Sequence, residues 1–161
     1  MAHERDHARR RAAAALLVRH RDLECRVEGA SMAPTLPPGT TIRVEPVEDD
    51  GWRRGDVAVF HAGERLYSHR IVAVGRRGPA RGHVLTMGDN RSVPDAPVER
   101  TDLLGRARLA AQDERIPAPT NEARARRMRS RLAAGLITAM FRVHPSLAES
   151  TQAALHRLAR D

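Results

Sequence analysis

Ser31 lies in a segment whose composition is incompatible with regular helix or strand, Gly29-Ala30-Ser31-Met32-Ala33-Pro34-Thr35-Leu36-Pro37-Pro38-Gly39. Proline fixes its own backbone angle and glycine allows close backbone approach, so the segment predicts a shaped loop. A serine hydroxyl held in such a loop is suited to nucleophilic catalysis if a general base and oxyanion donors lie within reach. The backbone N–H of Ser31 is the natural oxyanion donor.

The general base must come from the histidines, because the chain contains no lysine. Of the eight histidines, His69 is the one embedded in a β-branched segment, Tyr67-Ser68-His69-Arg70-Ile71-Val72. A strand gives a base the rigidity it needs, and neutral imidazole is available near pH 7. The alternative for a single strand histidine is a half-buried structural residue.

Two aspartates are candidates for the group that orients His69. Asp89 lies in the turn Gly88-Asp89-Asn90 at a strand end, and Asp95 is framed by Pro94 and Pro97. Asp89 also fits an Asx turn that only shapes the loop, and Asp95 also fits an exposed loop acid. The residues alone leave both aspartates open, and we expect no metal and no cofactor.

In their order and surroundings these residues resemble the type I signal peptidases, specifically the branch that uses histidine as base. The resemblance covers about residues 27–109 and rests on Gly29 to Leu36, Arg54-Gly55-Asp56-Val57-Ala58-Val59-Phe60, Ser68-His69-Arg70-Ile71-Val72, Thr86-Met87-Gly88-Asp89-Asn90, Asp95 and Leu104-Gly105-Arg106. It implies that Ser31 is the nucleophile and His69 the base. It also implies that Asp95 is the partner of the histidine and that Asp89 is a structural or catalytic aspartate.

The resemblance further implies how substrate binds. An extended peptide would add as a strand to a groove lined by Met32 and by the strand before Ser31. The family prefers small residues just before the cut, which implies a shallow apolar pocket. Some members of the family also place a serine hydroxyl in the oxyanion hole two residues before the nucleophile, where this chain has Gly29.

The predicted fold is mainly β. Apolar alternation and turn residues predict strands over 23–27, 40–47, 57–60, 66–74, 84–87 and 103–111, which form a small antiparallel domain over 23–120. We expect a basic helix over 1–22 and a basic helical extension over 121–161. The extension is predicted as two helices, 121–143 and 146–160, split at Pro145.

The net charge of +8 is concentrated at the two ends of the chain. Residues 1–22 carry +3 and residues 121–161 carry +5, whereas residues 23–120 hold fourteen arginines and fourteen acids. Basic ends suit a contact with anionic lipid, nucleic acid or an acidic protein, and the alternative is a solvated arginine-rich surface. Nucleic acid is disfavoured as a partner, because aromatic stacking residues are scarce and the central domain is neutral.

The sequence departs from the family in having no apparent membrane anchor or signal peptide. The apolar runs Ala12–Val18 and Leu132–Phe141 are short, and a spanning helix needs about 20 residues. We therefore expect a cytoplasmic or peripherally membrane-associated protein. The run Leu132–Phe141, which follows several arginines, fits either an in-plane membrane helix or a helix packed on the β domain.

The sequence thus predicts a serine endopeptidase that cleaves extended peptide segments, such as signal or leader peptides, through a Ser–His pair assisted by aspartate. A self-cleaving repressor-type peptidase shares this fold, but it needs a lysine base and a DNA-binding module for which about 22 N-terminal residues are too few. The second class of function is a non-catalytic basic module that binds nucleic acid or an acidic protein on a peptidase-like scaffold.

Overall fold

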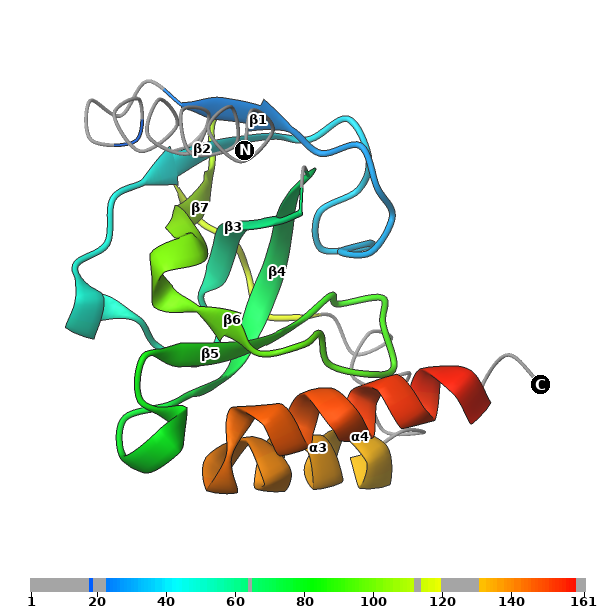
Figure 1. The fold of residues 1–161 in the computed structure, drawn as a ribbon. Helices are drawn as coiled ribbons and strands as arrows, with labels where there is room; N and C mark the ends of the chain where they lie inside the picture. The colour runs from blue at the N-terminus through cyan, green and yellow to red at the C-terminus, as the bar shows by residue number, and fades with distance from the viewer. Residues whose placement is uncertain (1–17, 19–22, 64, 112–113, 120–130, 159–161) are drawn as a thin grey trace, which may run out of the picture.

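The described part of the chain is an antiparallel β sheet with two helices packed against it (Figure 1). The computed structural model describes residues 18, 23–63, 65–111, 114–119 and 131–158. The helix predicted over 1–22 and the first part of the helix predicted from residue 121 lie outside these residues, apart from Val18. The mainly β class predicted from the sequence is confirmed.

Eight strands form one sheet in the order β1-β2-β7-β3-β4-β5-β6, with β8 paired to β7. Every pairing is antiparallel. The strands are β1 (Glu24–Arg26), β2 (Thr41–Glu45), β3 (Val57–Ala62), β4 (Arg65–Val74), β5 (His83–Met87), β6 (Val98–Glu99), β7 (Leu103–Leu109) and β8 (Glu114–Arg115). Short 3₁₀ turns follow β2, β4 and β6: η1 (Asp49–Gly51), η2 (Gly78–Ala80) and η3 (Arg100–Asp102).

Each of the six strands predicted from apolar alternation is present. The two strands that the sequence did not predict, β6 and β8, are two residues long each. Two residues are too few to show alternation, so these strands depend on a neighbour for their conformation. β6 pairs with β5 through His83 and Glu99, and β8 pairs with β7 through Arg108 and Arg115.

β3 is covered on both faces and lies next to β4, the strand that carries His69. It lies between β7 and β4, and four consecutive residues from Val57 to Phe60 are buried. Val57 and Val59 join a core with Met32, Leu36 and β2, whereas Ala58 and Phe60 join a second core with Trp52, Ile71 and Val84. A strand buried on both faces reads as a continuous apolar run rather than as an alternation, and it gives its neighbour β4 a rigid support.

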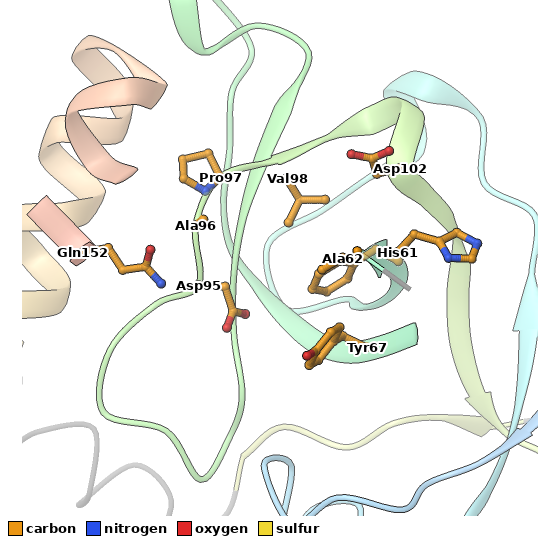
Figure 2. A pocket seen from close by; sticks show the side chains of 11 residues that line it. His61, Ala62, Tyr67, Asp95, Ala96, Pro97, Val98, Asp102 and Gln152 are labelled. Carbon is orange, nitrogen blue, oxygen red and sulfur yellow. The ribbon is translucent and has the colours of Figure 1, made fainter. Parts of the chain in front are cut away.

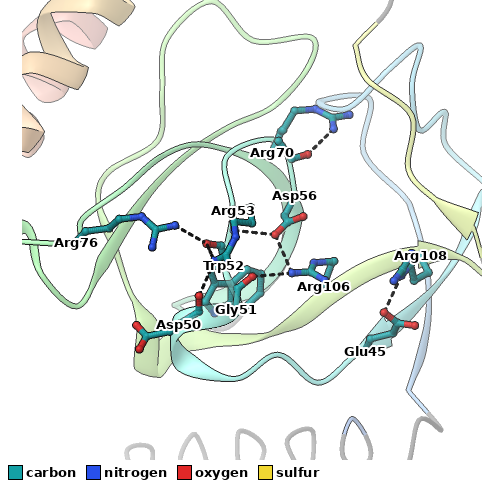
Figure 3. Close-up of polar contacts among 11 residues, drawn as sticks. Glu45, Asp50, Gly51, Trp52, Arg53, Asp56, Arg70, Arg76, Arg106 and Arg108 are labelled. Carbon is teal, nitrogen blue, oxygen red and sulfur yellow. Dashed lines mark hydrogen bonds and ion pairs between the residues drawn. The ribbon is translucent and has the colours of Figure 1, made fainter.

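The half-buried carboxylate of Asp56 ties the start of β3 to the middle of the sheet (Figure 3). Asp56 accepts a hydrogen bond from the backbone N–H of Arg53 at 2.9 Å. It also forms an ion pair with Arg106 of β7, again at 2.9 Å. Arg106 also donates to the carbonyl of Gly51. The Arg54-Gly55-Asp56 segment therefore connects the η1 turn with strands β3 and β7.

Helices α3 (Arg131–Val143) and α4 (Pro145–Leu158) lie side by side against the end of the sheet near β5 and η2 (Figure 1). Ile137 and Phe141 of α3 are buried against Ala80 and Leu85. Of the two sequence interpretations of this apolar run, the packed helix is therefore the one observed. Pro145 opens α4 as well as separating the helices, because proline needs no hydrogen-bond partner at a helix start.

Within the described ranges, no helix combines the length and the apolar character that crossing a bilayer requires.

Candidate active site

The Ser31 loop connects β1 to β2 and is anchored by two apolar side chains that are buried in the core. Leu36 is fully buried and Met32 is 1% exposed, and both belong to the core beneath the sheet. The backbone N–H of Leu36 donates to the carbonyl of Met32 at 2.9 Å, which closes one turn. The prediction that Met32 lines an open groove is therefore wrong: the serine turn directs Ser31 outward and Met32 into the core.

The structure brings Ser31, His69 and Asp95 into one line of hydrogen bonds. Ser31 Oγ lies 2.9 Å from His69 Nε2, although 38 residues separate them in the sequence. On the other edge of the ring, His69 Nδ1 lies 2.6 Å from Asp95 Oδ2. Serine, imidazole and carboxylate thus occupy the positions that nucleophile, base and orienting group need for acyl transfer.

The carboxylate of Asp95 decides how the imidazole is protonated. An ionised carboxylate only accepts hydrogen bonds, so His69 Nδ1 carries the proton in the neutral ring. His69 Nε2 is then an acceptor, and the Ser31 hydroxyl donates to it. This tautomer is the one that removes the hydroxyl proton during nucleophilic attack.

His69 is held by the sheet and by two aromatic side chains. The residue is only 3% exposed, and β4 places it opposite Ala58 of β3. The rings of Phe60 and Tyr67 lie 6.1 Å and 5.9 Å from the imidazole ring, centroid to centroid. The imidazole therefore has little freedom to rotate away from Ser31 and Asp95.

Thr86 is a further residue of the site that sequence reasoning did not single out. Its hydroxyl donates to Asp95 Oδ2 at 2.8 Å, the same oxygen that His69 contacts, and its carbonyl accepts from the backbone N–H of Asp95 at 2.8 Å. Thr86 is fully buried at a strand position. The signal that could have identified Thr86 is its hydroxyl in an otherwise apolar, buried strand, because a buried polar group needs a hydrogen-bond partner.

Asp89 occupies a separate, buried ion pair with Arg70. Arg70 Nε and Nη2 donate to the two carboxylate oxygens of Asp89 at 3.0 and 2.8 Å, and neither side chain is more than 5% exposed. Arg70 also donates to the carbonyls of Gly55 and Pro117. Of the two candidate aspartates, Asp95 contacts His69, whereas Asp89 binds Arg70, the residue that follows His69.

The turn that contains Asp89 also clamps the serine loop. The backbone N–H of Asn90 donates to the carbonyl of Ser31 at 2.7 Å, and the Asn90 side chain donates to the carbonyl of Ala30 at 3.1 Å. The backbone N–H of Asp89 points at the sulfur of Met32 at 3.3 Å. The Gly88-Asp89-Asn90 turn therefore fixes the position of Ser31 from a distant part of the sequence.

We expect a Gly88→Ala substitution to displace Ser31. A Cβ at residue 88 would lie 2.6 Å from the carbonyl oxygen of Ser31, and backbone cannot move aside as a flexible side chain can. A misplacement of about 1 Å in a catalytic group costs about 10²-fold in rate, so we expect kcat for peptide cleavage to fall by about that factor. Gly135→Ala is the matched control, because a Cβ there meets nothing within 4 Å. Equal activity of the two variants would contradict the clamp.

A pocket of about 520 Å³ opens beside the triad (Figure 2). It lies between the tip of the β3–β4 hairpin, the loop from Asp95 to Val98, and α4. Asp95 belongs both to this pocket and to the hydrogen-bonded line through His69, and its side chain is 28% exposed.

Other chemistry receives less support from the described residues. Burial raises the pKa of the Cys25 thiol, and this residue packs against the core beside β2, as a small core side chain does. Within the described ranges, no group of three or more His, Cys, Asp or Glu residues is arranged to hold a metal ion. A scan against models of protein families and a search of the curated proteins each return no match to the sequence.

Proposed function

We propose that this protein is a serine endopeptidase, with Ser31 as nucleophile, His69 as general base and Asp95 as the residue that orients His69. The observation that carries the proposal is the unbroken line of two hydrogen bonds, 2.9 Å from Ser31 Oγ to His69 Nε2 and 2.6 Å from His69 Nδ1 to Asp95 Oδ2. A scaffold that only binds a partner has no need for this tautomer and alignment.

In the proposed acylation step, Ser31 Oγ attacks the carbonyl carbon of the scissile peptide as its proton passes to His69 Nε2. The resulting imidazolium is stabilised by Asp95, and the tetrahedral intermediate collapses as the carbon–nitrogen bond breaks. The proton on Nε2 goes to the departing amine, which leaves an ester on Ser31. A water molecule that loses its proton to the same imidazole then hydrolyses the ester and regenerates the serine.

The negative charge on the tetrahedral intermediate needs hydrogen-bond donors that are fixed in advance. The backbone N–H of Ser31 is one donor at the tight turn of the loop. Gly29 leaves open space on the exposed side of this loop, because a Cβ there would meet no atom within 4 Å. We propose that substrate reaches the serine from this open side and that backbone donors bind the oxyanion.

The substrate class that best fits these features is an extended polypeptide segment, as in signal-peptide or leader-peptide processing. The sequence resemblance over about residues 27–109 supports this class. A peripheral contact with an anionic membrane through the basic termini is part of the same proposal, and most of the residues concerned lie outside the described ranges.

The test is to incubate the full chain with a peptide library, with and without anionic lipid vesicles, and to identify cleavage products by mass spectrometry. We expect cleavage by the unmodified protein and none by Ser31→Ala, which removes the nucleophilic oxygen and leaves the rest of the side chain in place. Arg43→Gln, a surface change on β2, is the control for preparation and folding. Absence of any Ser31-dependent cleavage, with or without lipid, would overturn the proposal and favour a binding module on the same scaffold.

A further inference from the structure

The pocket beside the triad combines an apolar floor with a charged margin. Phe60, Pro97 and Val98 contribute apolar surface, and Figure 2 shows Asp95, Asp102 and Gln152 distributed around Val98. Among the described residues that line the pocket, the formally charged side chains are Asp95 and Asp102, and no arginine takes part. This is notable for a chain that carries 28 basic residues, all of them arginine, against 20 acidic ones.

One carboxylate oxygen of Asp95 can accept a further hydrogen bond at this pocket. Asp95 uses Oδ2 for both His69 and Thr86, which leaves Oδ1 with no hydrogen-bond partner among the described residues. The partly exposed side chain can therefore receive a further donor without losing its contact with His69. Asp102, in η3, contributes a second negative charge at the margin of the same pocket.

Aromatic side chains add a face that attracts cations. Tyr67 stacks on Phe60 with ring centroids 6.0 Å apart, and both residues line the pocket. The face of an aromatic ring attracts an ammonium or guanidinium group by its quadrupole. A long basic side chain also has an apolar stem, which can lie along the floor while its head reaches the margin.

We propose that this pocket is a specificity subsite for an arginine or lysine side chain of the polypeptide substrate, a few residues from the scissile bond. The inference rests on the proposed peptidase function, because it assigns the substrate class of the same site. Asp95 connects the subsite with the triad, since a single imidazole ring lies between its carboxylate and Ser31. The substrate would therefore carry a positive charge near the cut.

The test uses fluorescently labelled alanine–serine decapeptides with one arginine at each successive position, and the same set with neutral citrulline. An exposed ion pair contributes up to about 1 kcal/mol, which corresponds to about fivefold, and the desolvated stem and ring contact add to it. We expect kcat/KM to be about tenfold higher for arginine than for citrulline at one position, since these contributions combine there.

Two substitutions test whether the arginine preference depends on the charge of the pocket. Asp102→Asn should reduce the arginine preference to about twofold, because the margin then holds one carboxylate fewer. Gln152→Glu, on the exposed helix α4, should raise the preference by about threefold. Asp50→Asn is the matched control, because Asp50 is a fully exposed aspartate outside the pocket.

The outcomes distinguish failure of the subsite from failure of the proposed function. Ser31-dependent cleavage with equal rates for arginine and citrulline, or with a preference that Asp102→Asn leaves intact, would overturn the subsite alone. If no peptide is cleaved, anisotropy with the Ser31→Ala protein decides. Binding of arginine peptides that exceeds citrulline and is weakened by Asp102→Asn would support a cation pocket, and equal binding would overturn it.

Discussion

A His69→Ala variant is expected to lose about 10⁶-fold in kcat for peptide cleavage and an Asp95→Asn variant about 10⁴-fold, with little change in KM. Removal of His69 leaves the Ser31 hydroxyl without a proton acceptor at 2.9 Å. Asparagine at residue 95 keeps the shape of the side chain but offers either a neutral acceptor or a donor. It thereby weakens the preference for the Nδ1–H tautomer and removes the charge that stabilises the imidazolium.

This ranking is checked by single-turnover kinetics on one cleaved peptide, with the fold of each variant verified by circular dichroism. Groups that act as one unit are strongly non-additive, so the double variant Ser31→Ala/His69→Ala should be no slower than either single variant. Thr86→Val gives a graded intermediate, because it removes one of the two hydrogen bonds to Asp95 Oδ2. An Asp95→Asn protein with full activity would exclude this carboxylate from the reaction.

Removal of one partner of the Arg70–Asp89 pair should cost about 3–5 kcal/mol in the free energy of unfolding. The pair is almost completely buried, and Arg70 makes four hydrogen bonds, so Arg70→Met leaves the Asp89 carboxylate without its arginine partner in a dry site. A domain of this size has about 5–15 kcal/mol of total stability, so the variant should lie close to unfolding at room temperature.

Urea unfolding measures the loss in the free energy of unfolding, and an exposed ion pair serves as the comparison. Arg43 and Glu24 form an ion pair across β1 and β2 whose side chains are 32% and 47% exposed, so Arg43→Met should change stability by less than about 1 kcal/mol. The double variant Arg70→Met/Asp89→Leu should recover part of the loss, because no unpaired charge remains. Equal effects of Arg70→Met and Arg43→Met would contradict a structural role for the buried pair.

The sequence predicted the sheet well because its long strands carry local signals. Alternation of apolar residues in Thr41–Glu45 and the buried run in Val57–Phe60 identified their strands without any knowledge of the neighbours. The short strands β6 and β8 exist only through pairing with β5 and β7, so no local pattern marked them. The position of the two helices on the sheet likewise depended on contacts of Ile137 and Phe141 that the sequence left undecided.

The candidate site was predictable in its residue types but not in its connections. The loop composition selected Ser31, and the absence of lysine together with a strand position selected His69. The choice between Asp89 and Asp95 required the path of the loop after β5, since the two lie only six residues apart. Met32 was placed in a peptide-binding groove on the basis of the family resemblance, whereas the turn directs it into the core.

The clamp between Asn90 and Ser31 also depends on residues that are synthesised far apart in time. Fifty-seven residues separate the backbone contacts of the Asp89 turn from Met32, so a growing chain exposes the serine long before the turn that holds it has been made. The histidine follows next, and its orienting carboxylate comes last. A ribosome-bound fragment that ends before Asp95 therefore carries Ser31 and His69 without the carboxylate that orients the imidazole.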